Sequence, residues 1–166
     1  SGIIRRLAHN VSEHVQETLI ETYAAHYLNP NNHNMTLFPE ALSCLQRLQQ
    51  QGYWLAIATG KGRSGLDKAI AQTNTQAFWL ETACAGEYPS KPAPDMVLAL
   101  CDRLGVEPKE AVVVGDTTHD LEMAANAKIR AIAVATGAHT AQQLSSMPHV
   151  AILNSLAELP DVLETL

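Results

Sequence analysis

Short apolar runs and amphipathic stretches alternate along most of the chain. The apolar runs have the pattern of strands that are buried on both faces, and they lie at 53–58, 78–85, 112–114, 131–135 and 150–153. Apolar residues at helical spacing separate them and predict helices over 39–52, 64–72, 95–104, 120–127, near 141–145 and over 156–166. This alternation predicts an α/β fold, in which helices cover both faces of a parallel sheet.

The first 36 residues follow a different pattern. Between Ser12 and Leu28, apolar residues recur every four positions, which predicts an amphipathic helix with Ser12 as its N-cap. The segment 29–34 is rich in asparagine and contains a proline, so we interpret it as a loop and a candidate domain boundary. We therefore expect a small helical part over 1–36 and an α/β domain over 37–166.

Composition restricts the classes of function. The 166 residues are 46% hydrophobic and 17% charged, as in a globular protein of one domain. The net charge is −6 and no basic run exceeds Arg5-Arg6, which argues against nucleic acid as a partner. We see no apolar run of membrane-spanning length and no signal peptide. Cys44, Cys84 and Cys101 lack CxxC spacing, so we expect reduced thiols and a cytoplasmic location.

Two acidic residues follow the apolar run 112–114. Gly115 permits a sharp turn, Asp116 lies at the carboxyl end of the predicted strand, and Asp120 falls in the first turn of the next helix. Ligands of open α/β sheets bind at this edge. Two carboxylates there repel each other unless a cation lies between them, and Mg²⁺ prefers such oxygen ligands. The alternative is that Asp116 only makes a turn and Asp120 only caps a helix.

Two further strand ends carry polar groups. Thr59 and Gly60 follow the run 53–58 and offer a hydroxyl and backbone N–H groups, and Lys91 precedes the helix at 95–104. Taken singly, Thr59 is typical of a turn residue, and Lys91 is typical of a solvated side chain. Together with the two carboxylates, they form the set that a phosphate and Mg²⁺ require at one edge of a sheet.

The order and spacing of these residues resemble the haloacid-dehalogenase superfamily, and most closely its phosphoglycolate-phosphatase-type members. Thr59 matches the second family motif, Lys91 the third, and Gly115-Asp116-Thr117-Thr118-His119-Asp120 the metal-binding fourth. The resemblance implies a Rossmann-like core over 37–166, a remnant of a helical cap over 1–36, and Mg²⁺-dependent hydrolysis of a small phosphorylated metabolite through an aspartyl-phosphate.

The resemblance also implies a role for each matching residue. Thr59, Gly60 and Lys91 would hold the phosphoryl group, with Thr59 and Lys91 as catalytic residues. Asp116 and Asp120 would form the metal site, with Asp120 also orienting Lys91.

One family motif has no counterpart. The Asp-x-Asp-Gly-Thr sequence that supplies the nucleophile should precede the cap, but the first aspartate here is Asp67. We therefore expect an N-terminally truncated, inactive chain that binds Mg²⁺ weakly or not at all, with Lys91 paired to Asp116 or Asp120. The missing strand would lie between the strands that carry Thr59 and Asp116. The gap would be filled by residues 2–5, by a second chain through dimerisation or strand exchange, or by a bound fragment.

Other functions remain open at this point. A non-catalytic phosphate-binding or interaction module with the same pocket is the main alternative. A dehalogenase fits less well, because that chemistry needs no metal-binding acids, and a dinucleotide-binding domain lacks its GxGxxG sequence. A zinc site at His119 is rejected, because no second histidine or cysteine has a ligand-like spacing.

Overall fold

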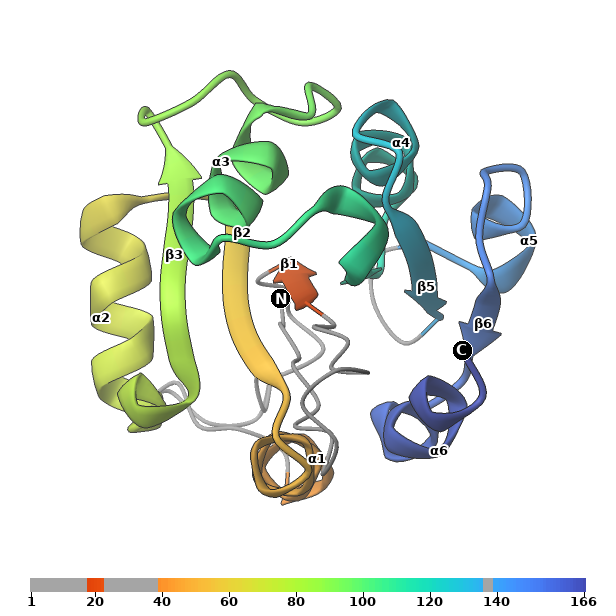
Figure 1. Cartoon of the computed structure of the whole chain (residues 1–166), viewed down its shortest axis with the longest axis horizontal. Helices are drawn as coiled ribbons and strands as arrows, with labels where there is room; N and C mark the ends of the chain where they lie inside the picture. The colour runs from red at the N-terminus through yellow and green to blue at the C-terminus, as the bar shows by residue number, and fades with distance from the viewer. Residues whose placement is uncertain (1–17, 23–38, 136–138) are drawn as a thin grey trace.

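The computed structural model describes residues 18–22, 39–135 and 139–166, and these contain a six-stranded sheet with the strand order β3-β2-β1-β4-β5-β6 (Figure 1). All five neighbouring pairs are parallel. The strands are β1 (Thr18–Thr22), β2 (Trp54–Gly62), β3 (Trp79–Ala85), β4 (Ala111–Gly115), β5 (Arg130–Val134) and β6 (Ala151–Leu153).

Helices cover both faces of this sheet, which confirms the predicted α/β architecture. In Figure 1, α3 and α4 lie above the sheet, and α1 and α6 lie below it. The helices are α1 (Pro39–Gln50), α2 (Arg63–Thr73), α3 (Asp95–Leu104), α4 (Thr118–Asn126), α5 (Ala141–Leu144) and α6 (Leu159–Glu164), with short 3-10 helices at Gln76–Phe78, Pro108–Glu110 and Leu156–Glu158. Within the described ranges, no helix is long and apolar enough to cross a membrane.

The core follows from the alternation of side chains along the inner strands. Val113 of β4 packs with α3 and α4, whereas Val112 and Val114 pack with α1 and α6. Every residue of β4 is buried, as expected for a strand that has helices on both sides. Small residues are frequent on the α3 and α4 side, where the strands contribute Ala56, Ala58, Ala111, Ala131 and Ala133.

The predicted helix over 12–28 is wrong for residues 18–22, which form β1. This strand pairs with β2 on one side and with β4 on the other. Pairing on both edges satisfies backbone N–H and C=O groups that two facing strand edges would otherwise leave unpaired in the core. Pairing within the sheet therefore decides the conformation of residues 18–22, although the local spacing of apolar residues favours a helix. The gap between β2 and β4 is thus filled by residues 18–22 and by none of the three expected sources. Residues 2–5, the flanks of 12–28 and the loop 29–34 lie outside the described residues.

Smaller differences concern boundaries and one helix face. In α1, Leu42 is 38% exposed, whereas Ala41 and Cys44 are buried. Strand β2 continues through Thr59 to Gly62, so Thr59 lies inside the strand and not after it. The predicted helix over 156–166 is divided into a 3-10 turn and α6. All three cysteines are buried free thiols, as predicted.

Candidate active site

The carboxyl ends of β2 and β4 lie at the same edge of the sheet, on either side of β1. Position 21 of β1 is in register with Ile57 of β2 and with Val114 of β4. Adjacent strands are about 4.8 Å apart, so the backbones that lead to Thr59 and Asp116 are separated by roughly 10 Å. This is the separation that one tetrahedral anion and its side-chain contacts can bridge.

Thr59 lies in an irregular part of β2 and is fixed by a local hydrogen bond. Its side chain is 1% exposed, and its hydroxyl oxygen accepts a hydrogen bond from the N–H of Lys61 at 3.1 Å. The pairing of β2 with β3 is irregular between Ala58 and Gly62, so this stretch departs from the regular ladder. Gly60 is exposed, and a Cβ built there would meet nothing within 4 Å. This part of β2 thus presents the buried hydroxyl of Thr59 next to the exposed backbone of Gly60.

Asp120 folds back onto the turn that begins α4. One carboxylate oxygen, Oδ2, accepts hydrogen bonds from the N–H groups of Asp116 at 3.2 Å and Thr117 at 3.1 Å. The hydroxyl of Thr117 accepts the N–H of Asp120 at 3.2 Å, which completes a capping box. A Cβ on Gly115 would lie 2.4 Å from the Cβ of Asp120. Glycine is therefore required at 115 for Asp120 to reach this position.

Lys91 reaches the other oxygen of the same carboxylate. Its Nζ lies 2.7 Å from Oδ1 of Asp120, and the two side chains are 15% and 2% exposed. The loop that carries Lys91 is also tied to the end of α4, because the side-chain amide of Asn126 donates to the carbonyl of Pro92 at 2.9 Å. The expected pairing of Lys91 with one of the two aspartates is therefore confirmed, and Asp120 is the partner. Both Asp120 oxygens are engaged in this arrangement.

Asp116 lies one residue beyond β4 and is 4% exposed. It belongs to the same turn as Asp120, whose carboxylate pairs with Lys91. Among the described residues, no cluster of three or more His, Cys, Asp or Glu side chains could hold a metal ion.

The contacts of Arg63 and a contact of His139, both near this edge, were missed by the sequence analysis. Arg63 donates to the hydroxyl of Thr82 at 2.8 Å and forms an ion pair with Glu87 at 3.0 Å. The ion pair attaches the start of the segment between β3 and Lys91 to α2. The i,i+4 pair of Arg63 and Asp67, at 3.2 Å, was the one local signal for this cluster. The contact of His139 with Thr118 spans 21 residues, and no local spacing indicates it.

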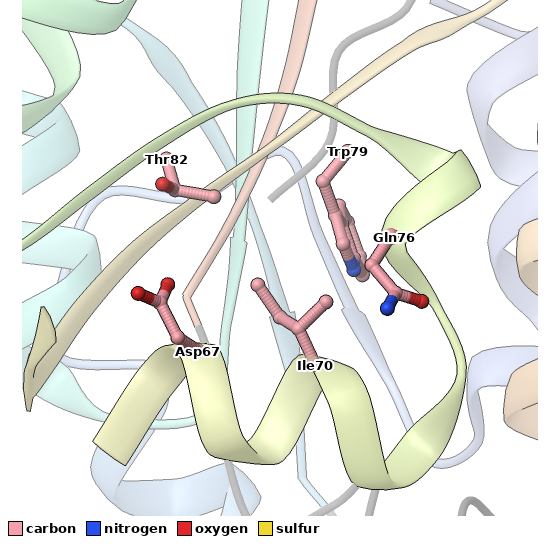
Figure 2. Close-up of a pocket in the computed structure, with 5 residues that line it drawn as sticks. All are labelled: Asp67, Ile70, Gln76, Trp79 and Thr82. Carbon is pink, nitrogen blue, oxygen red and sulfur yellow. The ribbon is translucent and has the colours of Figure 1, made fainter. Parts of the chain in front are cut away.

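A pocket of about 290 Å³ lies between α2 and β3 and is separate from the candidate site (Figure 2). Figure 2 shows Asp67 and Ile70 rising from α2 toward Thr82 and Trp79, with Gln76 beside the indole ring. None of the predicted site residues lines this pocket.

A family model described as haloacid dehalogenase-like hydrolase matches residues 2–134. The chain is 34% identical over 125 residues to "Probable phosphatase IndB" of Dickeya dadantii, which covers 74% of this chain and 54% of that protein. It is 30% identical over 145 residues to the pyrophosphatase PpaX of Bacillus velezensis, with 86% and 67% covered. It is 31% identical over 125 residues to a phosphoglycolate phosphatase of Aquifex aeolicus, with 73% and 58% covered.

Solved structures show the same fold. A hydrolase from Pseudomonas syringae superimposes with a TM-score of 0.72 at 20% identity, over 81% of this chain and 65% of that one. The chain spans about half the length of the Dickeya relative and two thirds or less of the other proteins compared here.

Proposed function

Because this chain belongs to the haloacid dehalogenase-like hydrolase family, we propose that it carries the phosphoryl-binding edge of a phosphatase that acts on a small phosphorylated metabolite. The observation that carries the proposal is the buried ion pair of Lys91 and Asp120, at the sheet edge that Thr59 and Asp116 share. A lysine so oriented offers its remaining N–H bonds to an anion. The relatives named as phosphatase, pyrophosphatase and phosphoglycolate phosphatase share P–O bond hydrolysis and differ in the substrate.

In this proposal, the chain contributes three groups that bind the phosphoryl oxygens. The hydroxyl of Thr59 and the N–H of Gly60 would donate from β2, and the ammonium of Lys91 would donate from the loop before α3. These donors are held before the ligand arrives, because Thr59 is buried and Lys91 is paired at 2.7 Å. Preorganised donors stabilise the charge that develops on phosphoryl oxygens without a cost of reorganisation.

Mg²⁺ fits this edge through Asp116. Mg²⁺ in phosphate sites retains water and relies on one or two carboxylates together with phosphate oxygens, so a single buried carboxylate is a sufficient but weak protein ligand. Asp120 supports the site indirectly, since its oxygens accept from Lys91, Asp116 and Thr117. When bound, the metal would neutralise charge between the phosphate and Asp116.

Binding of phosphate and hydrolysis of a phosphomonoester need different groups. An aspartyl-phosphate requires an aspartate nucleophile, and the sequence contains none before Asp67, which lies on α2 and pairs with Arg63. We therefore propose that the chain by itself binds phosphate without hydrolysing phosphomonoesters. The same observation favours the alternative of a phosphate-binding module with no reaction of its own.

The experiment measures inorganic phosphate binding by calorimetry, with and without Mg²⁺, and hydrolysis of p-nitrophenyl phosphate. Phosphate binding should be strengthened by Mg²⁺ and lost in Lys91→Ala. Asp116→Asn should remove the effect of Mg²⁺ and keep metal-free binding. Lys109→Ala, which removes an exposed lysine, is the matched control. Absence of phosphate binding in the millimolar range would refute the site. Steady turnover that Lys91→Ala abolishes would show that the chain holds its own nucleophile.

A further inference from the structure

The first N–H of helix α4 is capped by a side chain from another loop. The N–H of Thr118 donates to Nδ1 of His139 at 2.9 Å, and this contact is partly buried. Thr118 is the first residue of α4, which follows the N-cap Thr117, and His139 lies between β5 and α5. Because Nδ1 accepts a hydrogen bond from a backbone N–H, the imidazole must be neutral with its hydrogen on Nε2.

This hydrogen bond and the pair of Lys91 with Asp120 both join the turn to other loops. The bonds among Asp116, Thr117 and Asp120 lie within one short segment, so they move together with it. The bond to His139 instead joins that segment to the loop after β5. It therefore restrains the position of the whole turn relative to the sheet, and Asp120 in turn holds Lys91 at 2.7 Å.

The neighbouring ring of His119 suggests a different use, namely a metal bound between two histidines. The ring centroids are 6.4 Å apart and the planes are tilted by 57°. Metal ligation needs a ring nitrogen with an available lone pair. In His139 the lone pair of Nδ1 points at the N–H of Thr118, and Nε2 carries the hydrogen. The observed hydrogen bond therefore favours a role in positioning over a role as a ligand.

We infer that His139 is a positioning residue: its Nδ1 fixes the turn 116–120, and through Asp120 it keeps Lys91 aimed at the anion site. The part of this inference that concerns the anion rests on the proposed function. The part that concerns the turn stands on the contacts alone, so the two are tested by different measurements.

Two polar variants of His139 distinguish the roles of its two ring nitrogens. In His139→Asn the side-chain oxygen can occupy the place of Nδ1, whereas in His139→Gln it reaches the place of Nε2. Both replacements are polar and lie at a half-buried position, so folding is expected to survive. Nitrogen NMR of the wild-type imidazole should show the tautomer with hydrogen on Nε2. Amide hydrogen exchange at Thr118, Asp116 and Thr117 should be unchanged in His139→Asn and roughly fivefold faster in His139→Gln, the effect of one typical hydrogen bond.

Calorimetry with inorganic phosphate then tests the link to the site. Affinity should fall severalfold in His139→Gln and be retained in His139→Asn. A hydrogen on Nδ1, or equal amide exchange in the two variants, would overturn the positioning of the turn. Equal phosphate affinity in wild type and both variants, with altered exchange at Thr118, would overturn the link to the anion site. If neither the wild type nor the two variants bind phosphate while amide exchange follows the expected pattern, the proposed function fails and the positioning of the turn stands.

Discussion

Lys91→Met is the most direct test of the buried ion pair. Methionine keeps much of the length of the lysine stem and removes the ammonium. In the folded chain, this leaves a carboxylate that is 2% exposed without its ion-pair partner, while Oδ2 still accepts from the N–H groups of Asp116 and Thr117. The unfolded chain is little affected, because both side chains are solvated there. The variant should therefore be less stable.

The size of the loss follows from burial. Breaking a buried pair by removing one partner costs about 3–5 kcal/mol. The lower end applies here, because two backbone hydrogen bonds to Asp120 remain and Lys91 is 15% exposed. We expect a loss of about 3 kcal/mol at pH 7, which corresponds to a fall in Tm of roughly 6–12 °C for a chain of this size. Lys109→Met is the control, since Lys109 and Glu107 are 81% and 66% exposed and such pairs contribute less than about 1 kcal/mol.

Urea unfolding of Lys91→Met, Asp120→Asn and the double variant gives the coupling energy of the pair. The double variant should lose less unfolding free energy than the two single variants together, because Asp120→Asn removes the buried charge that Lys91→Met leaves without an ammonium. A loss in Lys91→Met no larger than in the Lys109→Met control would refute the reasoning. So would strict additivity in the cycle.

Three further predictions concern other parts of the chain. Gly115→Ala should destabilise the protein by at least about 2 kcal/mol in urea unfolding, because its Cβ would meet that of Asp120 at 2.4 Å. Burial raises the pKa of Cys44 and Cys101 to about 12, so iodoacetamide at pH 8 should label them slowly when folded and rapidly in urea; fast labelling of the folded chain would contradict this. Burial alone would raise the pKa of Glu87, but hydrogen bonds from Cys84 and Arg63 together outweigh it and lower that pKa. The stabilisation by the Glu87 carboxylate is therefore present at neutral pH and is lost in acid. Urea unfolding of Glu87→Gln should accordingly show a deficit at pH 7 that shrinks below roughly pH 4.

Most of the fold was predictable because its signals are local. The apolar run at 112–114 became the fully buried β4, and the helix predicted over 95–104 has those bounds as α3. The strand at 18–22 was not predictable in this way. Its partners begin at Trp54 and Ala111, so its conformation is decided by contacts that form only when the sheet assembles. Local spacing over 12–28 carries no information about those two distant edges.

The site divides in the same manner. Thr59, Lys91 and Asp120 were identified from residue type, order and position after apolar runs, and the structure brings Lys91 and Asp120 into contact. His139 was missed, because its contact with Thr118 joins two residues that are 21 positions apart in the sequence. Periodicity reveals which face of an element is buried, but it does not reveal which loop covers the end of a neighbouring helix.

The central place of β1 connects the fold to the proposed chemistry. Its carboxyl end lies one strand spacing, about 5 Å, from the strands that lead to Thr59 and to Asp116, so it occupies the middle of the candidate site. Under the proposed function, this middle position is one from which the chain could reach a phosphate held by Thr59 and Lys91. The sequence of β1, TLIET, has no aspartate. Under the proposed function, phosphate binding would depend on groups of β2, of the turn after β4 and of Lys91, whereas turnover would need a nucleophile that β1 does not supply as an aspartate.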